Sequence, residues 1–397
     1  MNFRKTILVA SIAAACASTA FAADPKKMPE KPAIPSFGQI MEATGVSITG
    51  YIDASYTDLS GNGTFTGGTP NRVFDREHRS FNVNALDLTI SALPPDGFGG
   101  MVNLTAGSDA KVIGSAGTDI NDEFDVTQAY VHFSKGSLMV IGGKYVTLSG
   151  AEVIKSPANL NFSRSILFGY AIPFAHTGLR AYFTPGGSAV SPDGKPTFIV
   201  GLNNGWDVQQ ESASANCVST TNCADGKTAE LGLLTNLGKM VSLAASYYKG
   251  EEPSSTSSQI GQRSLFDVVA TFTVTDNLSF VLNYDKAEQD KALTGGNKAK
   301  WSGLAGYVNY KLNDAWRVAF RTESFDDKDG FRTGVNLGTG GQKWKESTIT
   351  LANTPAKNVE LRAELRMDSS NVSSFNQTDG STKKSQRSAA LEAIYKF

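Results

Sequence analysis

Hydrophobic and polar residues alternate along most of the chain, from about residue 46 to the end. In residues 359–368, apolar side chains from Val359 to Met367 alternate strictly with Glu, Arg and Asp. A helix would scatter these apolar groups around its surface and would place like charges four residues apart. A strand places every charge on one face. The segment therefore predicts a β-strand with one apolar and one polar side.

The same alternation occurs, with varying clarity, in sixteen segments, and their number is even. Most are much longer than the usual strand of about 5 to 6 residues. A strand of about ten residues, tilted by about 40°, crosses the apolar band of an outer membrane, which is about 25 Å thick. The segments are residues 46–57, 79–92, 98–109, 124–135, 137–147, 177–185, 195–205, 227–237, 240–250, 263–275, 278–288, 300–312, 315–325, 343–353, 358–368 and 386–397.

Short and long connections take turns between these segments. Tight turns rich in Gly, Pro, Asn and Asp follow alternate strands, as hairpins require. Long polar loops join the other strand ends, at residues 58–78, 110–123, 148–176, 206–226, 251–262, 289–299, 326–342 and 369–385. Backbone groups in lipid must all be paired, so the sheet has to close. The pattern predicts an all-β protein: a closed antiparallel transmembrane β-barrel of about 16 strands, with short periplasmic turns and long extracellular loops.

The first 45 residues lack this pattern. Residues 1–22 combine Arg4 and Lys5 with an apolar run and an Ala-Phe-Ala end, which is typical of a secretory signal peptide. The apolar run is too short for a membrane anchor, and Cys16 leaves a lipoprotein site as an alternative. Residues 23–45 are expected to be a periplasmic linker that could hold a short helix, as a tether or a plug. The barrel domain is expected over residues 46–397.

Composition excludes several classes of function. The chain has 37 Lys and Arg against 38 Asp and Glu, with three His and three Cys. This balance gives no basic surface for nucleic acid, and we expect no metal centre and no cofactor. Cys217 and Cys223 are expected to form a disulfide in an exported protein, with two free thiols as the alternative.

Several motifs resemble one known family. The chain is similar to the putative beta-barrel porin-2, OmpL-like, family at residues 50–56, 124–131, 156–165, 201–206 and 395–397, and the run at 156–165 is the most specific. The resemblance covers roughly residues 46–397. It implies a porin-like channel in the outer membrane of a Gram-negative bacterium, and it implies that the terminal Phe397 is a signal for the barrel-assembly machinery.

A barrel of sixteen to eighteen strands leaves an aqueous channel. The loop 148–176 is unusually apolar for a surface segment, so we expect it to fold inward and narrow the lumen rather than form an external cap. The candidate charges at this constriction are Glu152, Lys155, Arg164, His176 and Arg180.

Alternation also assigns charged residues to the lumen, where opposite signs across a pore would create a transverse field. The alternative is that they pair with residues of neighbouring strands. Both signs occur, so ion preference stays open. The candidates are Asp53, Asp87, Asp267, Arg317, Arg321, Glu323, Glu360, Arg362, Glu364 and Arg366.

The sequence therefore predicts a porin that lets small hydrophilic solutes or ions diffuse passively. No G-x-S-x-G motif is present, and we do not expect an enzyme. The alternative is an adhesive or structural outer-membrane barrel with little conductance. Expected partners are outer-membrane lipid and lipopolysaccharide, the barrel-assembly machinery and the diffusing solutes, and we expect a homotrimer.

Overall fold

The computed structural model describes residues 41, 43–115, 122–190, 193–210, 226–254, 256–257 and 259–397. Residues 41–397 form one compact unit. The expected signal peptide, the linker up to residue 40, and Cys217 and Cys223 lie outside the described residues. At the end of the expected linker 23–45, which could hold a short helix, Met41, Ala43 and Thr44 are described, and they are helical.

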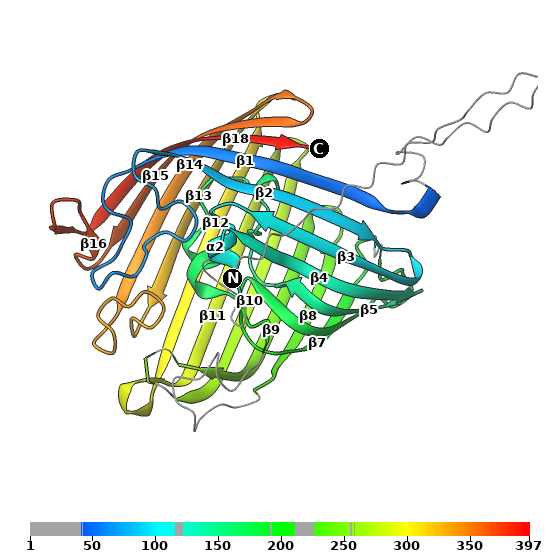
Figure 1. Ribbon diagram of the computed structural model, residues 1–397, viewed down its shortest axis with the longest axis horizontal. Helices are drawn as coiled ribbons and strands as arrows, with labels where there is room; N and C mark the ends of the chain where they lie inside the picture. Colours follow the sequence, from blue (N-terminus) through cyan, green and yellow to red (C-terminus); the bar gives the residue numbers. More distant parts are fainter. Residues whose placement is uncertain are drawn as a thin grey trace, which may run out of the picture. The chain divides into compact units, whose positions relative to one another are not determined.

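The described residues form a closed antiparallel barrel of sixteen strands, each hydrogen-bonded to its neighbours in chain order (Figure 1). The long alternating segments make this possible, because each strand turns one face to the lumen and one outward. The strands are β1 (Ser47–Leu59), β2 (Ser80–Ala92), β3 (Asp96–Ala106), β4 (Phe124–Lys135), β5 (Leu138–Val146), β6 (Ala175–Phe183), β7 (Thr197–Asn203), β8 (Thr228–Leu237), β9 (Val241–Pro253), β10 (Ile260–Thr275), β11 (Leu278–Leu293), β12 (Asn297–Lys311), β13 (Trp316–Asp327), β14 (Gln342–Ala356), β15 (Val359–Ser370) and β18 (Ser385–Lys396).

The barrel closes where the last strand meets the first. β18 pairs with β1, and Tyr51 lies opposite Lys396 in this ladder. Gly50 and Phe397 exchange two backbone hydrogen bonds of 2.9 Å. A Cβ atom on Gly50 would lie 2.6 Å from the Phe397 ring, so glycine is needed at this contact. The first and last strands of the barrel are thereby joined without a free sheet edge.

All sixteen expected strands are present, but several loop boundaries were wrong. β9 and β10 leave a shorter connection than the expected loop 251–262, and β11 and β12 occupy most of the expected loop 289–299. These two hairpins extend the barrel wall. The expected loop 369–385 contains a small hairpin, β16 (Phe375–Asn376) with β17 (Thr382–Lys383).

After the helical residues that precede β1, the helical segments in the described part of the chain are short and lie between strands. They are α2 (Ala110–Ile113), the 3-10 turns η1 (Ser156–Ala158) and η3 (Thr294–Gly296), and the π-helical turn η2 (Leu167–Ala171). In the part of the chain that the structure describes, no helix has the length and apolar composition needed to cross a membrane.

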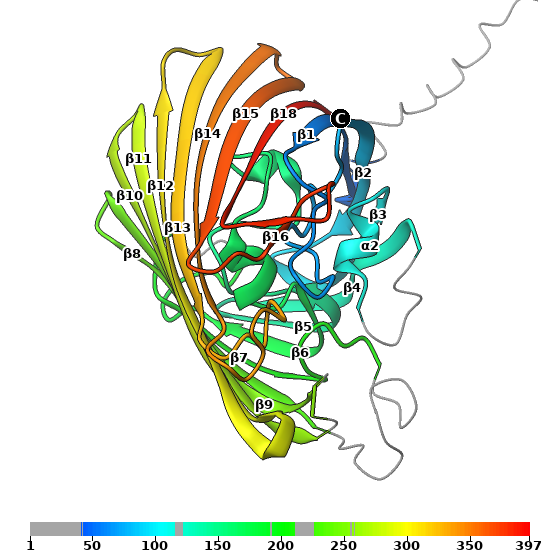
Figure 2. The same ribbon diagram turned by 90° about the vertical axis from the view of Figure 1, so that its left-hand side faces the viewer.

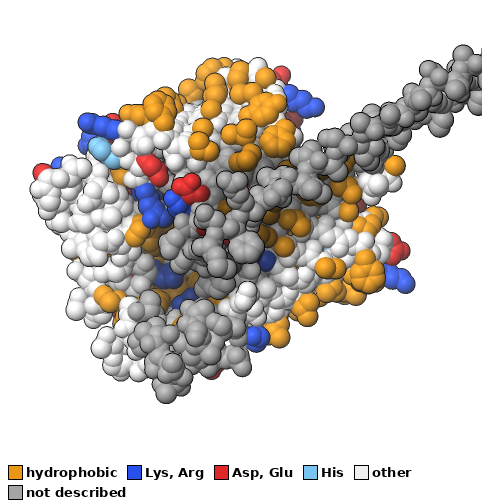
Figure 3. All heavy atoms as spheres, in the orientation of Figure 1, with side chains coloured by type: hydrophobic (Ala, Val, Ile, Leu, Met, Phe, Trp, Pro, Cys, Tyr) orange, Lys and Arg blue, Asp and Glu red, His pale blue; other side chains and the backbone are white. Residues whose placement is uncertain are grey.

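The outer face of the barrel is largely apolar. Hydrophobic side chains gather on the wall around β1 and β18 (Figure 3). Outward aromatic residues such as Phe98, Trp316 and Tyr395 lie at strand ends next to the short turns, where an interfacial girdle is expected. This face suits contact with lipid.

The inner face carries buried polar and charged residues together with an apolar cluster. The segment between β5 and β6, residues 147–174, lies inside the barrel (Figure 2). We call it the inner loop. Its residues Ile166, Leu167 and Phe168 belong to the main hydrophobic cluster, which also contains Trp301 and Trp344 of the wall.

Candidate functional site

The inner loop covers its apolar residues by packing them against the barrel wall. Leu167 lies against the bare backbone of Gly303 on β12, where an added Cβ would meet the Leu167 Cδ1 at 2.6 Å. Trp301, also on β12, donates its indole N–H to the Ala171 carbonyl at 3.1 Å. The burial removes apolar side chains from water, and it explains why this loop is unlike an exposed surface segment.

Two wall carboxylates bind backbone amides of the inner loop. Glu364 on β15 accepts hydrogen bonds from the N–H groups of Phe162, at 2.7 Å, and Ser163, at 3.0 Å. Glu323 on β13 accepts from Ile166 at 2.6 Å and from the next amide at 3.1 Å. Amides of an irregular loop would otherwise be buried without partners, which is costly. The carboxylates therefore fix the loop backbone.

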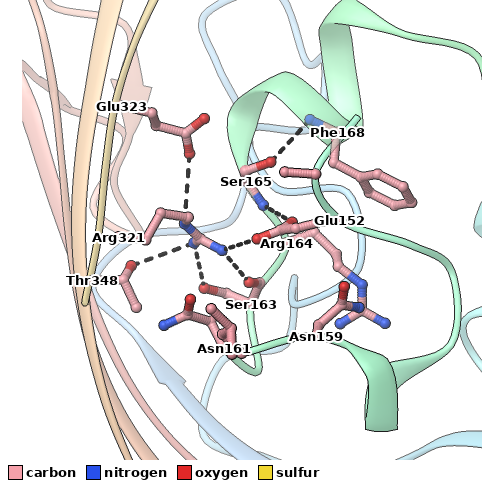
Figure 4. A network of polar contacts seen from close by, with 12 residues as sticks. Glu152, Asn159, Asn161, Ser163, Arg164, Ser165, Phe168, Arg321, Glu323 and Thr348 are labelled. Atoms are coloured by element: carbon pink, nitrogen blue, oxygen red, sulfur yellow. Dashed lines mark hydrogen bonds and ion pairs between the residues drawn. The ribbon is translucent and has the colours of Figure 1, made fainter. Parts of the chain in front are cut away.

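Arg321 on β13 is the centre of a buried polar network (Figure 4). Its guanidinium donates to the Glu152 carboxylate at 2.7 Å and to the Ser163 carbonyl at 2.6 Å. It also pairs with Glu346 of β14 at 3.0 Å. The planar guanidinium can reach several acceptors at once, which suits this role. Arg321 joins the loop to two strands.

Three further arginines of the wall donate to carbonyl groups of the inner loop. Each also has an ion-pair partner: Arg317 of β13 and Arg362 of β15 both pair with Glu360 of β15, and Arg366 pairs with Asp368 on the same strand. The loop contacts are Arg317 to Leu160 (2.7 Å), Arg362 to Asn159 (2.9 Å) and Arg366 to Arg164 (2.7 Å). The arginines of this wall thus bind neighbouring strands and the loop together.

The five candidate constriction charges lie in different surroundings. Glu152 is buried against Arg321, and Arg164 donates to loop carbonyls, including that of Ile154 at 2.7 Å. Lys155 crosses to β2, where it lies 3.3 Å from Asp87. Of the five, Lys155 has the most exposed side chain, with 34 % exposure.

The remaining two candidates lie on β6: Arg180 within the expected strand 177–185, and His176 because β6 begins at Ala175 and the loop is shorter than expected. His176 stacks on Tyr248 of β9, with 4.8 Å between ring centroids. Arg180 pairs with Glu230 of β8 at 2.6 Å and lies over the Tyr145 ring. Both side chains are buried against neighbouring strands of the wall, and neither belongs to the Arg321 network that binds the inner loop.

The acidic lumen candidates are also hydrogen-bonded to neighbouring strands. Asp53 accepts from Asn84 at 2.9 Å, and Asp87 accepts from Asn103 at 2.8 Å. Asp267 accepts from Asn283 at 2.7 Å and lies directly opposite Asp285 in the β10–β11 ladder. These acids line the inner face of the wall.

Charged groups of other loops are also enclosed. Asp109, next to α2, is buried, and this burial raises the pKa of its carboxyl well above the usual value. Arg332, in the loop after β13, donates to the Tyr170 carbonyl at 2.5 Å and lies over the Trp301 ring. Burial lowers the pKa of Arg332 to about 10.

A family model matches residues 45–397, described as putative beta-barrel porin-2, OmpL-like. The chain belongs to this family. It is an outer-membrane porin, a channel for passive diffusion in the bacterial outer membrane. Membership indicates a channel rather than an enzyme. In the described part of this porin, no group of three or more His, Cys, Asp or Glu side chains could hold a metal ion.

Solved outer-membrane proteins share the fold of this porin at low identity. The outer membrane channel DcaP of Acinetobacter baumannii is 15% identical, with a TM-score of 0.60, over 89% of this chain and 97% of that chain. An anion-selective porin from Comamonas acidovorans is 12% identical, with a TM-score of 0.59, over 89% and 99%. The trimer form of OmpT from Vibrio cholerae is 11% identical, with a TM-score of 0.58, over 89% and 99%. No curated protein matches the chain.

Sequence reasoning missed residues of the buried polar network that surrounds the inner loop of this porin. Arg72, in the loop after β1, pairs with Asp75 and with Asp368 of β15, both at 2.8 Å. Glu346 has the same parity as Thr348 and Thr350 of β14, which alternate with the apolar Ile349 and Leu351, so strand parity could have placed it in the lumen beside Arg321. No local signal identifies Arg72, because its partner Asp368 is 296 residues away.

Proposed function

We propose that small hydrophilic solutes diffuse through this porin by a path that the inner loop narrows. The observation that carries the proposal is that the loop contacts both sides of the barrel. On one side the Ser149 hydroxyl lies 2.7 Å from the Ser246 hydroxyl of β9, which is seven strands from β2 around the barrel, and Ala151 donates its backbone N–H to Asn283 of β11 at 3.1 Å. On the other side Lys155 donates to Thr89 of β2 at 2.6 Å. A segment held between two walls reduces the free cross-section of the lumen.

The contacts favour a fixed constriction over a mobile gate. Glu364, Arg321 and Arg362 are buried, and each binds the loop backbone directly. Breaking one such contact would leave a charge without its partner at low dielectric. Lys155 remains partly exposed, whereas its partner Asp87 is buried, so we propose the Lys155 ammonium group as the solvated charge at the narrowest part.

Single-channel recording of the purified protein in a planar bilayer tests the proposal. In the test variant, residues 153–160 are replaced by a short Gly-Ser linker. We expect a stable conductance step for the wild type and a larger step for the variant, together with faster entry of larger sugars into liposomes. The matched control shortens the hairpin at Thr294–Gly296, which lies between β11 and β12, and its conductance should equal that of the wild type.

Two outcomes would contradict the proposal. An unchanged conductance in the folded loop variant would show that the loop does not narrow the path. A folded wild-type barrel without measurable conductance would favour the adhesive or structural alternative.

We also propose a homotrimer. OmpT of Vibrio cholerae, which shares this fold, has a solved trimer form. β5, β6 and β7 have 9, 9 and 7 residues, whereas β10 and β11 have 16. At about 3.3 Å per residue and a tilt of about 40°, the short strands span less than an apolar band of about 25 Å. A neighbouring subunit could cover this wall. Mass determination of the protein in detergent by light scattering tests the trimer.

Three features of processing and assembly complete the proposal. We propose that residues 1–22 are removed on export and that residues 23–45 remain as the periplasmic linker. Cys217 and Cys223 would form a disulfide, and Phe397, at the closing strand, would serve as the assembly signal. The intact mass of the protein isolated from outer membranes, with and without reduction and alkylation, checks the cleavage and the disulfide.

A further inference from the structure

The outer wall carries a lysine-lined groove across β9 to β13. Its volume is about 460 Å³, and Tyr247, Phe266, Lys286, Lys300 and Ser302 are among its lining residues. The register places these residues together: Phe266 lies opposite both Tyr247 and Lys286, and Lys286 lies opposite Ser302. The groove therefore joins aromatic rings to ammonium groups on the outward face of the sheet.

Two lysines of the groove, Lys286 and Lys300, have no protein partner among the described residues, unlike two other lysines of this wall. Lys298 pairs with Glu288 at 2.6 Å, and Lys343 lies 3.5 Å from Asp326. Lys286 and Lys300 are exposed, and within the described ranges of the chain their ammonium groups make no ion pair or hydrogen bond. Two free positive charges in one groove suit a ligand with phosphate groups.

The height of the groove on the wall matches a lipid headgroup. The outward residues of β11, starting beside a short turn, are Leu278, Phe280, Leu282 and Tyr284, and Lys286 follows them. Eight residues at about 3.3 Å each, tilted by about 40°, place Lys286 about 20 Å above the start of the strand. This is near the upper edge of the apolar band, on the side of the long loops.

A second groove of about 560 Å³ lies directly beside the first. Gly306, Thr322 and Ser347 provide small outward residues there, and Leu282, Leu304 and Met367 are among the other lining residues. Ser302 of the first groove and Leu304 of the second are consecutive outward positions of β12. Lys345, Ser324 and Ser369 line this groove toward the long loops. The small and apolar side chains along the rest of it fit a hydrocarbon chain.

We propose that these adjoining grooves bind a phosphorylated glycolipid of the outer leaflet, with its phosphates at Lys286 and Lys300 and an acyl chain along Gly306. Charge complementarity selects this occupant over a zwitterionic phospholipid, because unpaired lysines attract phosphate groups that carry excess negative charge. The neighbouring carboxylates Glu288 and Asp326 lie at the same groove, where they can interact with cations that accompany such lipids.

Titration of the purified full-length protein with bisphosphorylated lipid A, read by native mass spectrometry, tests the proposal. We expect Lys286→Gln/Lys300→Gln to weaken binding about tenfold or more, and Lys286→Arg/Lys300→Arg to retain it. Dephosphorylated lipid A should bind the wild type about as weakly as bisphosphorylated lipid A binds the Gln variant. Inorganic phosphate at millimolar concentration should not displace the lipid.

The matched control is Lys239→Gln/Lys311→Gln. These lysines are also exposed, and Lys311 ends β12 at the opposite edge of the barrel from Lys300. Wild-type affinity in the Lys286/Lys300 variant, an equal loss in the control, equal binding of dephosphorylated lipid, or displacement by inorganic phosphate would each overturn the proposal. Unchanged channel conductance and heat-modifiable gel mobility show that the variants are folded.

Discussion

The inner and outer faces of the paired strands β12 and β13 differ in how their charged residues are partnered. Inside, Arg321 and Glu323 bind the inner loop and are buried. Outside, Lys300 is exposed and its ammonium group has no partner within the described residues. Where the inner loop packs against the wall, water is excluded, so a buried charge there needs a protein partner. On the outer rim, water and lipid headgroups can serve as partners.

The strongest test of this contrast is Arg321→Met. The change leaves Glu152 and Glu346 buried without their shared cation, so we expect unfolding in urea to lose about 3–5 kcal/mol of stability. The inner loop should also become more mobile. Because the loop narrows the lumen, the single-channel current should then have a higher mean or more noise.

The control for this variant is Arg387→Met on β18, whose side chain is exposed. Its stability should stay within about 0.5 kcal/mol of the wild type. Equal losses in the two variants would mean that the buried network does not differ from an exposed charge.

A smaller effect is expected for Trp301→Phe, beside Lys300 on β12. The change removes the indole donor to the Ala171 carbonyl but keeps an aromatic ring in the cluster. We expect a loss of about 1 kcal/mol in urea unfolding, the usual value of one hydrogen bond. A loss of 4 kcal/mol or more would indicate that packing of the larger ring, rather than the hydrogen bond, holds this end of the loop.

Asp109→Asn tests the enclosed side through pH. Burial raises the pKa of this carboxyl in the folded protein, so the folded state binds its proton more readily than the unfolded state. The wild type should therefore lose stability relative to the variant as pH rises from about 4 through the raised pKa. Urea unfolding of both proteins between pH 4 and pH 8 measures this difference.

The exposed Asp379 gives a control of opposite sign. Ser381 donates to this carboxylate through its hydroxyl at 2.6 Å and its backbone N–H at 2.9 Å, and these bonds lower the pKa of Asp379. The stability that the Asp379 carboxylate contributes to the folded state should be present above the ordinary pKa of an aspartate and should be lost as pH falls through the lowered pKa. If the stability difference between wild type and variant changed with pH in the same direction for Asp109→Asn and Asp379→Asn, the raised pKa of Asp109 would be contradicted.

The smallest effect is expected for Lys300→Gln in detergent without glycolipid. Since the ammonium group has no protein partner, urea unfolding should change by no more than about 0.5 kcal/mol. A loss comparable with that of Trp301→Phe would reveal a structural role on the outer face and would remove the contrast between the two sides.

Strand number and face were available from the sequence because they depend on local alternation. The segment 359–368 predicted β15 within two residues, and the charged positions of that strand form its inner face. Boundaries were less certain where polar residues continue a strand beyond the membrane. At 289–299 the polar composition predicted a loop, but pairing across the hairpin extends β11 and β12.

Only part of the candidate site could be predicted from the sequence. The apolar composition of the loop after β5 indicated that it needs cover, and the structure provides this cover at Gly303 and Trp301. The assignment of His176 to the loop did not anticipate that β6 begins at Ala175. Partners such as Arg72 and Asp368 meet only because loops from distant parts of the chain enter the same lumen.

By itself, the sequence determined that this chain forms a closed barrel of sixteen strands, because alternation with a period of two along each strand shows which side chains face lipid. Tertiary structure decided which segment fills the lumen and which charged residues form ion pairs. Those outcomes depend on how far a loop reaches across the lumen and on which strands lie opposite it. Such distances arise from closure of the whole sheet and leave no local pattern in the chain.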